Sequence, residues 1–231
     1  MNEANLEKAM RIYYFLLKEG ELNFENNKEL YMDYSDSEVR ELLEILARES
    51  DVLIERYNQV VYLIPGEDND VIGIKDMEVQ KVISYDARKV DFYLSQYIMT
   101  LLIMTFFNGK GSFVKSRDFI RIGDLEEIVT TRLTYARSRK NIEREQEEAL
   151  FNITAMYEQW SALPIDEPGK RKTKYGYLRS VCTFLEKQGL LLYDMAEEEV
   201  RPTAKFTNLM TYHFLNGERM ELIEKILEEK P

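Results

Sequence analysis

One short pattern occurs twice in this chain and limits what it can fold into. In both places, apolar residues recur at intervals of three and four positions, and two short apolar segments follow. This spacing places the apolar side chains on one face of an α-helix. The apolar positions of the helix are Val39, Leu42, Leu43 and Leu46 in the first copy and Leu178, Val181, Cys182 and Leu185 in the second.

The segments after each helix predict a β-hairpin. In the first copy, VLIERY (52–57) and VVYLIP (60–65) flank Asn58-Gln59. In the second copy, GLLLYDM (189–195) and VRPT (200–203) flank an acidic turn. A helix buried on one stripe and followed by a hairpin is typical of the recognition helix and wing of a winged-helix domain. We therefore predict a mainly α chain with small β-hairpins, organised as tandem winged-helix domains.

Helical periodicity around the two copies predicts two domains. Residues 1–79 contain an opening helix near 3–18, a short helix near 26–34, the first copy and an additional edge strand at 71–74. Residues 80–231 contain an apolar helix, a short strand, another helix and the second copy. A long helical stretch at 141–163 precedes that copy. We therefore expect an N-terminal winged-helix domain (1–79) and a C-terminal one (80–231) that is expanded by a helical insertion.

The longest apolar run, residues 92–109, approaches the length of a membrane span. Ser95, Gln96, Tyr97, Thr100 and Thr105 interrupt it, which favours a buried core helix over a membrane segment. A single cysteine excludes a disulfide framework, and no segment has the pattern of a signal peptide. We therefore expect a cytoplasmic protein that does not bind membranes.

The net charge of −11 is unevenly distributed. Residues 1–79 contain 8 Lys/Arg and 19 Asp/Glu, whereas residues 80–231 contain 23 of each. The first half would repel DNA phosphates and attract basic partners. Its predicted recognition helix carries Glu38, Glu41, Glu44 and Glu49, so direct reading of bases by this helix is not expected.

Cations in the second half are the candidates for DNA contact. A basic cluster precedes and enters the second recognition helix, where charge and free backbone N–H groups of the helix start could together hold phosphate. A second set surrounds the predicted strand near 113–122. The DNA-contact candidates are Lys170, Arg171, Lys172, Lys174 and Arg179 in the cluster, with Lys110, Lys115 and Arg117 in the second set.

Aromatic residues of the first domain exceed the needs of one small core. Because aromatic side chains are enriched at protein interfaces, we expect them to mediate dimerisation or another protein contact. The interface candidates are Tyr13, Tyr14, Phe15, Tyr31, Tyr34 and Tyr62.

Residues that could support catalysis are scarce. Gly109-Lys110-Gly111-Ser112 lacks the first glycine of a phosphate-binding loop, because Met104 stands at that position. One histidine, His213, and one cysteine, Cys182, leave no Cys/His metal set and no catalytic dyad to choose. The many carboxylates follow helix-surface or turn spacing. We therefore expect a protein that is not an enzyme and needs no metal or cofactor.

The layout resembles the KITE proteins of bacterial SMC complexes, and most closely the MukE-like subunit of the Wadjet plasmid-defence system. The resemblance extends from the opening helix and the 52–65 hairpin to the 189–203 hairpin, and it rests on organisation rather than on a motif. It implies a homodimer that binds the kleisin subunit, sits near the SMC ATPase and helps to hold DNA, without sequence preference, during loop extrusion. Only the basic cluster at 170–179 matches the DNA-binding role by its chemistry.

Two alternatives remain open. A transcription regulator with tandem winged helices would need a basic recognition helix, which the second copy supplies. A divergent enzyme or a toxin–antitoxin component is the third interpretation. Neighbouring genes for an SMC ATPase, a kleisin and a Toprim protein would favour the first interpretation over both.

Overall fold

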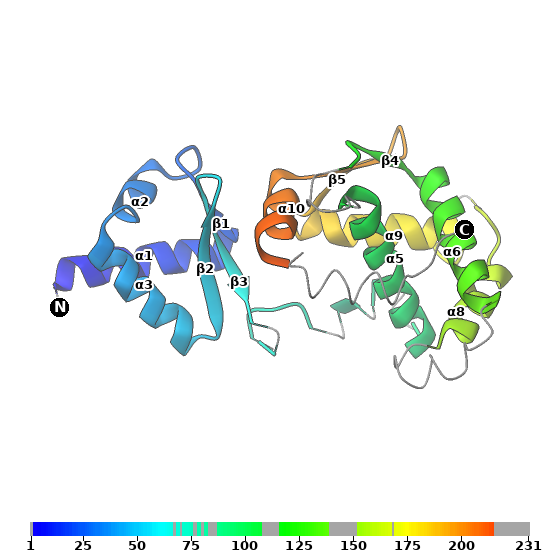
Figure 1. Cartoon of the computed structure of the whole chain (residues 1–231), viewed down its shortest axis with the longest axis horizontal. Helices are drawn as coiled ribbons and strands as arrows, with labels where there is room; N and C mark the ends of the chain where they lie inside the picture. The colour runs from blue at the N-terminus through cyan, green and yellow to red at the C-terminus, as the bar shows by residue number, and fades with distance from the viewer. Residues whose placement is uncertain are drawn as a thin grey trace. The chain divides into compact units, whose positions relative to one another are not determined.

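The structure is a computed structural model that describes residues 2–66, 68–69, 71–75, 78–79, 81–82, 87–107, 116–138, 152–167 and 169–214. It divides into two compact units, Met1–Lys75 (unit 1) and Asp76–Pro231 (unit 2). The boundary expected from the sequence followed residue 79. Each unit combines several helices with a small antiparallel sheet (Figure 1). A mainly α chain with small β-hairpins is therefore confirmed.

Side-chain caps define the helices of unit 1. Helix α1 (Glu3–Glu19) begins at Asn2, whose side chain accepts a hydrogen bond from Ala4 N, and ends at Gly20 with a φ of 76°. Short helix α2 (Lys28–Asp33) and helix α3 (Ser37–Glu49) begin in the same way, at Asn27 and Asp36. Such caps satisfy N–H groups that have no partner within the helix.

Three strands form the sheet of unit 1. Strand β1 (Glu21–Leu22) pairs with β3 (Val60–Pro65), which also pairs with β2 (Val52–Tyr57), so the order is β1-β3-β2. Asn58 and Gln59 join β2 to β3 with φ values of 47° and 66°. Positive φ at both positions is the type I′ geometry that suits the twist of a two-residue hairpin.

The core of unit 1 lies between its helices and one face of this sheet. Ile12 and Leu16 of α1 and Val39 and Leu43 of α3 are buried with Val61 of β3. The apolar stripe expected on α3 is therefore the face that holds the unit together.

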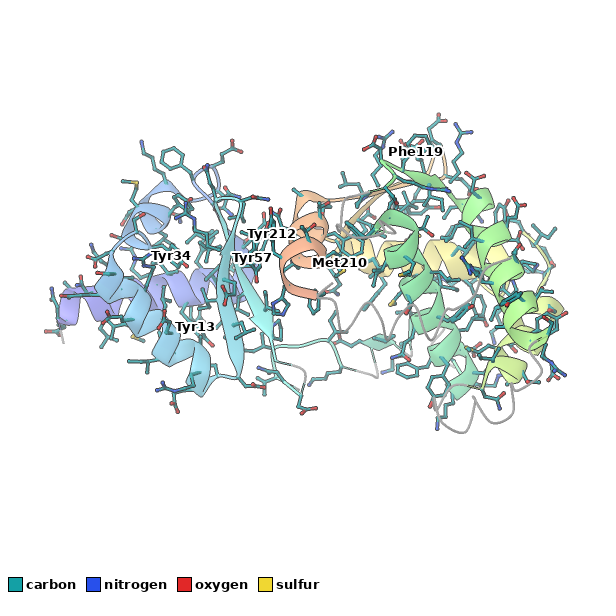
Figure 2. All side chains as sticks on the ribbon, viewed as in Figure 1. Tyr13, Tyr34, Tyr57, Phe119, Met210 and Tyr212 are labelled. Carbon is teal, nitrogen blue, oxygen red and sulfur yellow. The ribbon has the colours of Figure 1, made fainter. Side chains whose placement is uncertain are left out.

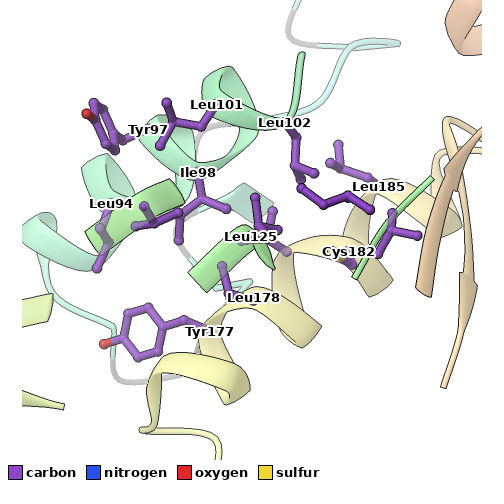
Figure 3. Packing of buried hydrophobic residues seen from close by; sticks show 14 of the residues in the cluster. Leu94, Tyr97, Ile98, Leu101, Leu102, Leu125, Tyr177, Leu178, Cys182 and Leu185 are labelled. Atoms are coloured by element: carbon purple, nitrogen blue, oxygen red, sulfur yellow. The ribbon is translucent and has the colours of Figure 1, made fainter. Parts of the chain in front are cut away.

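Unit 2 is larger and has a core of its own. Its helices are α5 (Lys89–Phe107), α6 (Ile122–Ser138), α8 (Ile153–Ala162), α9 (Lys174–Lys187) and α10 (Ala204–Leu209), the last continuing as a π-helical turn, η1 (Met210–Phe214). Figure 3 shows α5 and α9 facing each other through Leu94, Ile98, Leu178 and Cys182. Helix α8 lies in sequence between α6 and α9, where we expected an insertion, although residues 139–151 lie outside the described residues.

The sheet of unit 2 has the same order as that of unit 1. Strand β4 (Ile120–Arg121) pairs with β6 (Glu199–Pro202), which pairs with β5 (Leu191–Asp194), so the order is β4-β6-β5. In both units, the strand that comes first in sequence therefore pairs with the second strand of the hairpin.

Two expectations about individual segments have definite outcomes. Residues 71–72 form a turn and residue 73 a bend, so the expected edge strand at 71–74 is absent. Helix α5 is, within the described ranges, the one helix long and apolar enough to cross a membrane, yet half of its apolar window is buried inside the structure. Leu94, Ile98 and Leu102 on this helix have no exposed surface, so α5 provides one side of the core of unit 2.

Candidate functional site

The basic cluster lies where a loop turns into α9, and the loop occupies the N–H groups of the helix start. The N–H groups of Lys174 and Tyr175 donate to the carbonyls of Pro164 and Ile165, at 2.9 and 3.0 Å. Gly176 N donates to the hydroxyl of Thr173, at 2.8 Å. The free N–H groups that we expected to help hold phosphate are therefore already used within unit 2.

Gly176 allows this close packing between loop and helix. A Cβ atom at this position would lie 2.3 Å from the carbonyl oxygen of Arg171, which is closer than any real Cβ contact. Residues 170–176 (KRKTKYG) therefore form a closely packed connection between the loop and the start of α9.

Lys174 points into unit 2 and not toward solvent. Its Nζ donates to Glu126 Oε1 at 2.7 Å and to Thr130 Oγ1 at 3.2 Å, and it lies 5.4 Å from the centre of the Trp160 ring. Burial alone would raise the pKa of the Glu126 carboxyl, but the hydrogen bonds from Lys174 and Thr130 outweigh it and hold that pKa below its ordinary value. Lys174, expected to contact DNA, is instead an internal ion-pair partner.

Arg179 is engaged in the same way. Its guanidinium makes two hydrogen bonds to Asp166, at 2.9 and 3.0 Å, and a further ion pair with Glu198 of the β5–β6 turn. The hydrogen bond from Arg179 lowers the pKa of Asp166. Because two carboxylates already neutralise this cation, Arg179 is also withdrawn from the DNA-contact set.

The other basic residues that we expected to contact DNA differ in what the structure shows of them. Lys170, Arg171 and Lys172 are all exposed in the loop before α9, and Lys170 pairs with Glu167. Arg117 is exposed just before β4, and Lys110 and Lys115 lie outside the described residues. Arg171 and Lys172 are therefore the centre of the remaining basic surface, which we call the α9 loop cations.

The aromatic interface candidates of unit 1 also divide. Tyr34 is buried in the core, and Tyr62 is 2% exposed, so neither presents its ring to solvent. Tyr13, Phe15 and Tyr31 are partly buried against the core, and Tyr13 and Tyr34 lie among the helices of unit 1 (Figure 2). The surplus of aromatic residues is therefore mostly explained by packing within the unit.

Tyr14 is the exception, and it belongs to an exposed stripe on α1. Met10, Tyr14 and Leu17 are 57%, 75% and 39% exposed. Their spacing of four and three residues places them on one face of the helix, away from Ile12 and Leu16 in the core. We call these three residues the α1 stripe. Of the six interface candidates, Tyr14 is therefore the one that belongs to an exposed apolar face.

Comparison with known proteins places the chain in a family. A family model described as "Family of unknown function (DUF6063)" matches residues 1–230. The chain belongs to the DUF6063 family. No curated protein matches its sequence significantly. The family description names no activity, so the surfaces of the two units are the basis for proposing one.

The cysteine of this DUF6063 chain is not placed to react as a nucleophile. Cys182 is buried in the core of unit 2, and burial raises the pKa of its thiol to about 12. Its thiolate, the nucleophilic form, is therefore strongly disfavoured at neutral pH. Among the described residues, no three His, Cys, Asp or Glu side chains are grouped closely enough to hold a metal ion.

Proposed function

We propose that this DUF6063 chain is a non-catalytic subunit of the KITE type in an SMC–kleisin complex. In this role it dimerises, binds the kleisin and helps to hold DNA near the SMC ATPase, without reading its sequence. The Wadjet plasmid-defence complex is the assembly that its layout resembles most. The proposal places the protein in the cytoplasm.

The repeated topology is the observation that carries this proposal. Both units run helix, short strand, helix, helix and hairpin, and in both the first strand pairs with the last. Unit 2 adds α8 between α6 and α9, and it adds α10 and η1 after its hairpin. This order supports two winged-helix domains, the second one expanded, and a tandem pair of this kind is the layout of the KITE proteins.

The division of charge and apolar surface supports separate roles for the two units. Residues 1–79 hold 8 basic and 19 acidic residues, and unit 1 presents the α1 stripe to solvent. These features suit contacts with a second copy or a basic protein and oppose DNA. Unit 2 has no such acidic excess and carries the α9 loop cations, which suit a phosphate backbone.

Co-purification tests the proposal. The full chain would be co-expressed with a kleisin encoded beside it, and the complex would be analysed by size-exclusion chromatography with light scattering. We expect a stable complex that contains two copies of the chain. If no kleisin candidate encoded by a neighbouring gene binds the chain, the proposal that it is a subunit of an SMC–kleisin complex is wrong.

A transcription regulator is the second candidate, because Arg171 and Lys172 are exposed beside the helix that would read DNA. Selection from a random duplex library distinguishes the two. The KITE proposal predicts no enriched motif, since phosphate contacts carry no sequence information. An enriched motif would favour the regulator.

A further inference from the structure

Among the residues that the structure describes, no strand pairs with the outer edge of β2 in unit 1. A two-residue hairpin makes Tyr57 and Val60 a hydrogen-bonded pair, and such pairs then alternate along the ladder. Ile54 and Leu63 are therefore a non-bonded pair, in agreement with Leu63 N, which donates to Gly20 on the β1 side. It follows that the backbone N–H and C=O groups of Ile54 and Arg56 point away from β3 toward the free edge.

The corresponding edge in unit 2 is closed by a side chain. Tyr193 is the third residue of β5, as Ile54 is of β2, and its N–H donates to the carboxylate of Glu186 on α9, at 2.9 Å. Glu186 follows Leu185 as Ala47 follows Leu46 on α3. Because alanine has no acceptor, the N–H of Ile54 has no such partner within the described part of the chain.

A groove runs along this open edge. It has a volume of about 830 Å³ and lies between α3 and β2, which are neighbours in unit 1 (Figure 1). Ala47 and Ile54 both line it. Strand β2 is six residues long, contains neither proline nor glycine, and pairs with β3 without a bulge. Prolines and bulges are two of the features by which natural sheets block exposed edges, and β2 has neither, although it carries the charged residues Glu55 and Arg56.

We propose that this groove binds an extended segment of a partner protein, which adds to the sheet as a further strand beside β2. Main-chain hydrogen bonds to Ile54 and Arg56 supply affinity, and alternate side chains of the segment face α3. The groove itself does not depend on the proposed function. Only the identification of the partner as the kleisin rests on it.

The charges around the groove indicate a basic segment. Glu41, Glu44, Asp51 and Glu55 line the groove, and in the described ranges none of them forms an ion pair. Three arginines also line it: Arg48 pairs with Glu49, Arg56 lies over the ring of Tyr31, and Arg40 forms no ion pair in the described ranges. The four carboxylates without an ion pair therefore outnumber the two arginines without one. Unpaired carboxylates inside a strongly acidic unit favour lysine or arginine at alternate positions of the added strand.

A synthetic peptide can test this binding mode on the full chain. The probe alternates valine and lysine over the length of β2. Its control has the same sequence with N-methyl groups on alternate amides, which keeps the charge and removes strand hydrogen bonds. We expect the unmethylated peptide to bind at least about tenfold more tightly, as loss of one or two such bonds implies. Hydrogen exchange at Ile54 and Arg56 should slow when it binds. Equal binding of both peptides would overturn the proposal.

A matched pair of variants locates the site. Ala47→Glu copies the cap of unit 2 into unit 1 and should weaken binding of the unmethylated peptide by about tenfold. Ile45→Glu adds the same charge to α3 at a position that is 47% exposed and does not line the groove. It should retain binding within about twofold, an effect of net charge alone. Equal effects of the two variants would show charge repulsion and not strand addition.

The same variants separate this inference from the proposed function. If the chain binds the peptide but no kleisin, the groove stands and the KITE proposal fails. If a kleisin co-purifies equally well with wild type and Ala47→Glu, the KITE proposal stands and the groove is not the kleisin site. If Ala47→Glu alone loses the kleisin, both are supported.

Discussion

The hydroxyl of Tyr177 on α9 donates a 2.5 Å hydrogen bond to the carboxylate of Asp91 on α5, across 86 residues of sequence. Gln159 on α8 donates to both groups, at 3.2 Å to Asp91 and 3.1 Å to the Tyr177 oxygen. Burial and then the bond to Asp91 raise the pKa of Tyr177, so the phenol remains protonated at neutral pH. Helix α5 thus meets the consecutive helices α8 and α9 at one polar cluster.

Replacing Tyr177 by phenylalanine should destabilise unit 2. The change keeps the ring but leaves Asp91 and Gln159 without the hydroxyl. We expect a loss of about 1–3 kcal/mol in the free energy of unfolding, the range for an unsatisfied buried polar group. Urea denaturation would measure it. Tyr14→Phe is the control, since an exposed hydroxyl should change stability by less than about 0.5 kcal/mol. Equal stability of both variants would contradict a structural role for the network.

Gly176 offers a second test, because a methyl group at that position would meet the Arg171 backbone. Gly176→Ala should destabilise the chain by about 1–3 kcal/mol, as overpacking does, despite the better helix propensity of alanine. Gly123→Ala in α6 is the matched control. Its Cβ would lie 3.2 Å from the Tyr175 hydroxyl, the end of a side chain that can move. In thermal unfolding, Gly123→Ala should have a higher melting temperature than Gly176→Ala. The reverse order would refute close packing between the loop and the start of α9.

The spacing of apolar residues along the sequence predicted the positions of helices and strands well. It did not predict which side chains distant in sequence pair with one another. The stripe of α3 and the turn at Asn58-Gln59 are set by neighbouring residues, so β2 and β3 match the expected segments VLIERY and VVYLIP. The partners of Lys174 and Arg179 are not local. Lys174 meets Glu126 across 48 residues, and Arg179 meets Glu198 across 19. Counting nearby charges therefore overestimated the basic surface.

The ion pair of Lys174 predicts how stability depends on pH. Since the folded pKa of Glu126 lies below its ordinary value, the unfolded chain binds a proton more readily. The contribution of the pair is fully present above the ordinary glutamate pKa of about 4.3, and it is lost as pH falls through the lower folded value. Denaturation of Glu126→Gln between about pH 3 and 6 should therefore show a shallower acid decline than wild type. Parallel curves would show that the pair does not titrate with folding.

DNA binding should depend on the α9 loop cations and not on the buried ones. Arg171→Ala with Lys172→Ala should weaken binding to duplexes of any sequence. The slope of log affinity against log salt should fall by about 2, because each phosphate that a cation neutralises adds about 1 to that slope. Fluorescence anisotropy over a salt series would measure it. Lys18→Ala, an exposed cation of unit 1, should leave the slope unchanged. A decrease in the control equal to that in the double variant would place the DNA surface elsewhere.

The α1 stripe predicts the site of self-association. Met10, Tyr14 and Leu17 expose apolar surface on one face of a helix, and pairing with a second copy would bury it. Tyr14→Asp places a charge at the centre of that face and should raise the dimer dissociation constant at least about tenfold. Light scattering over a concentration series would measure it. Ile45→Asp, on the exposed side of α3, introduces the same charge outside the stripe and should leave the dimer intact. If both variants dissociate equally, the stripe does not form the dimer interface, and the dimer must use another surface. A monomeric wild type would contradict the dimerisation on which the KITE proposal depends.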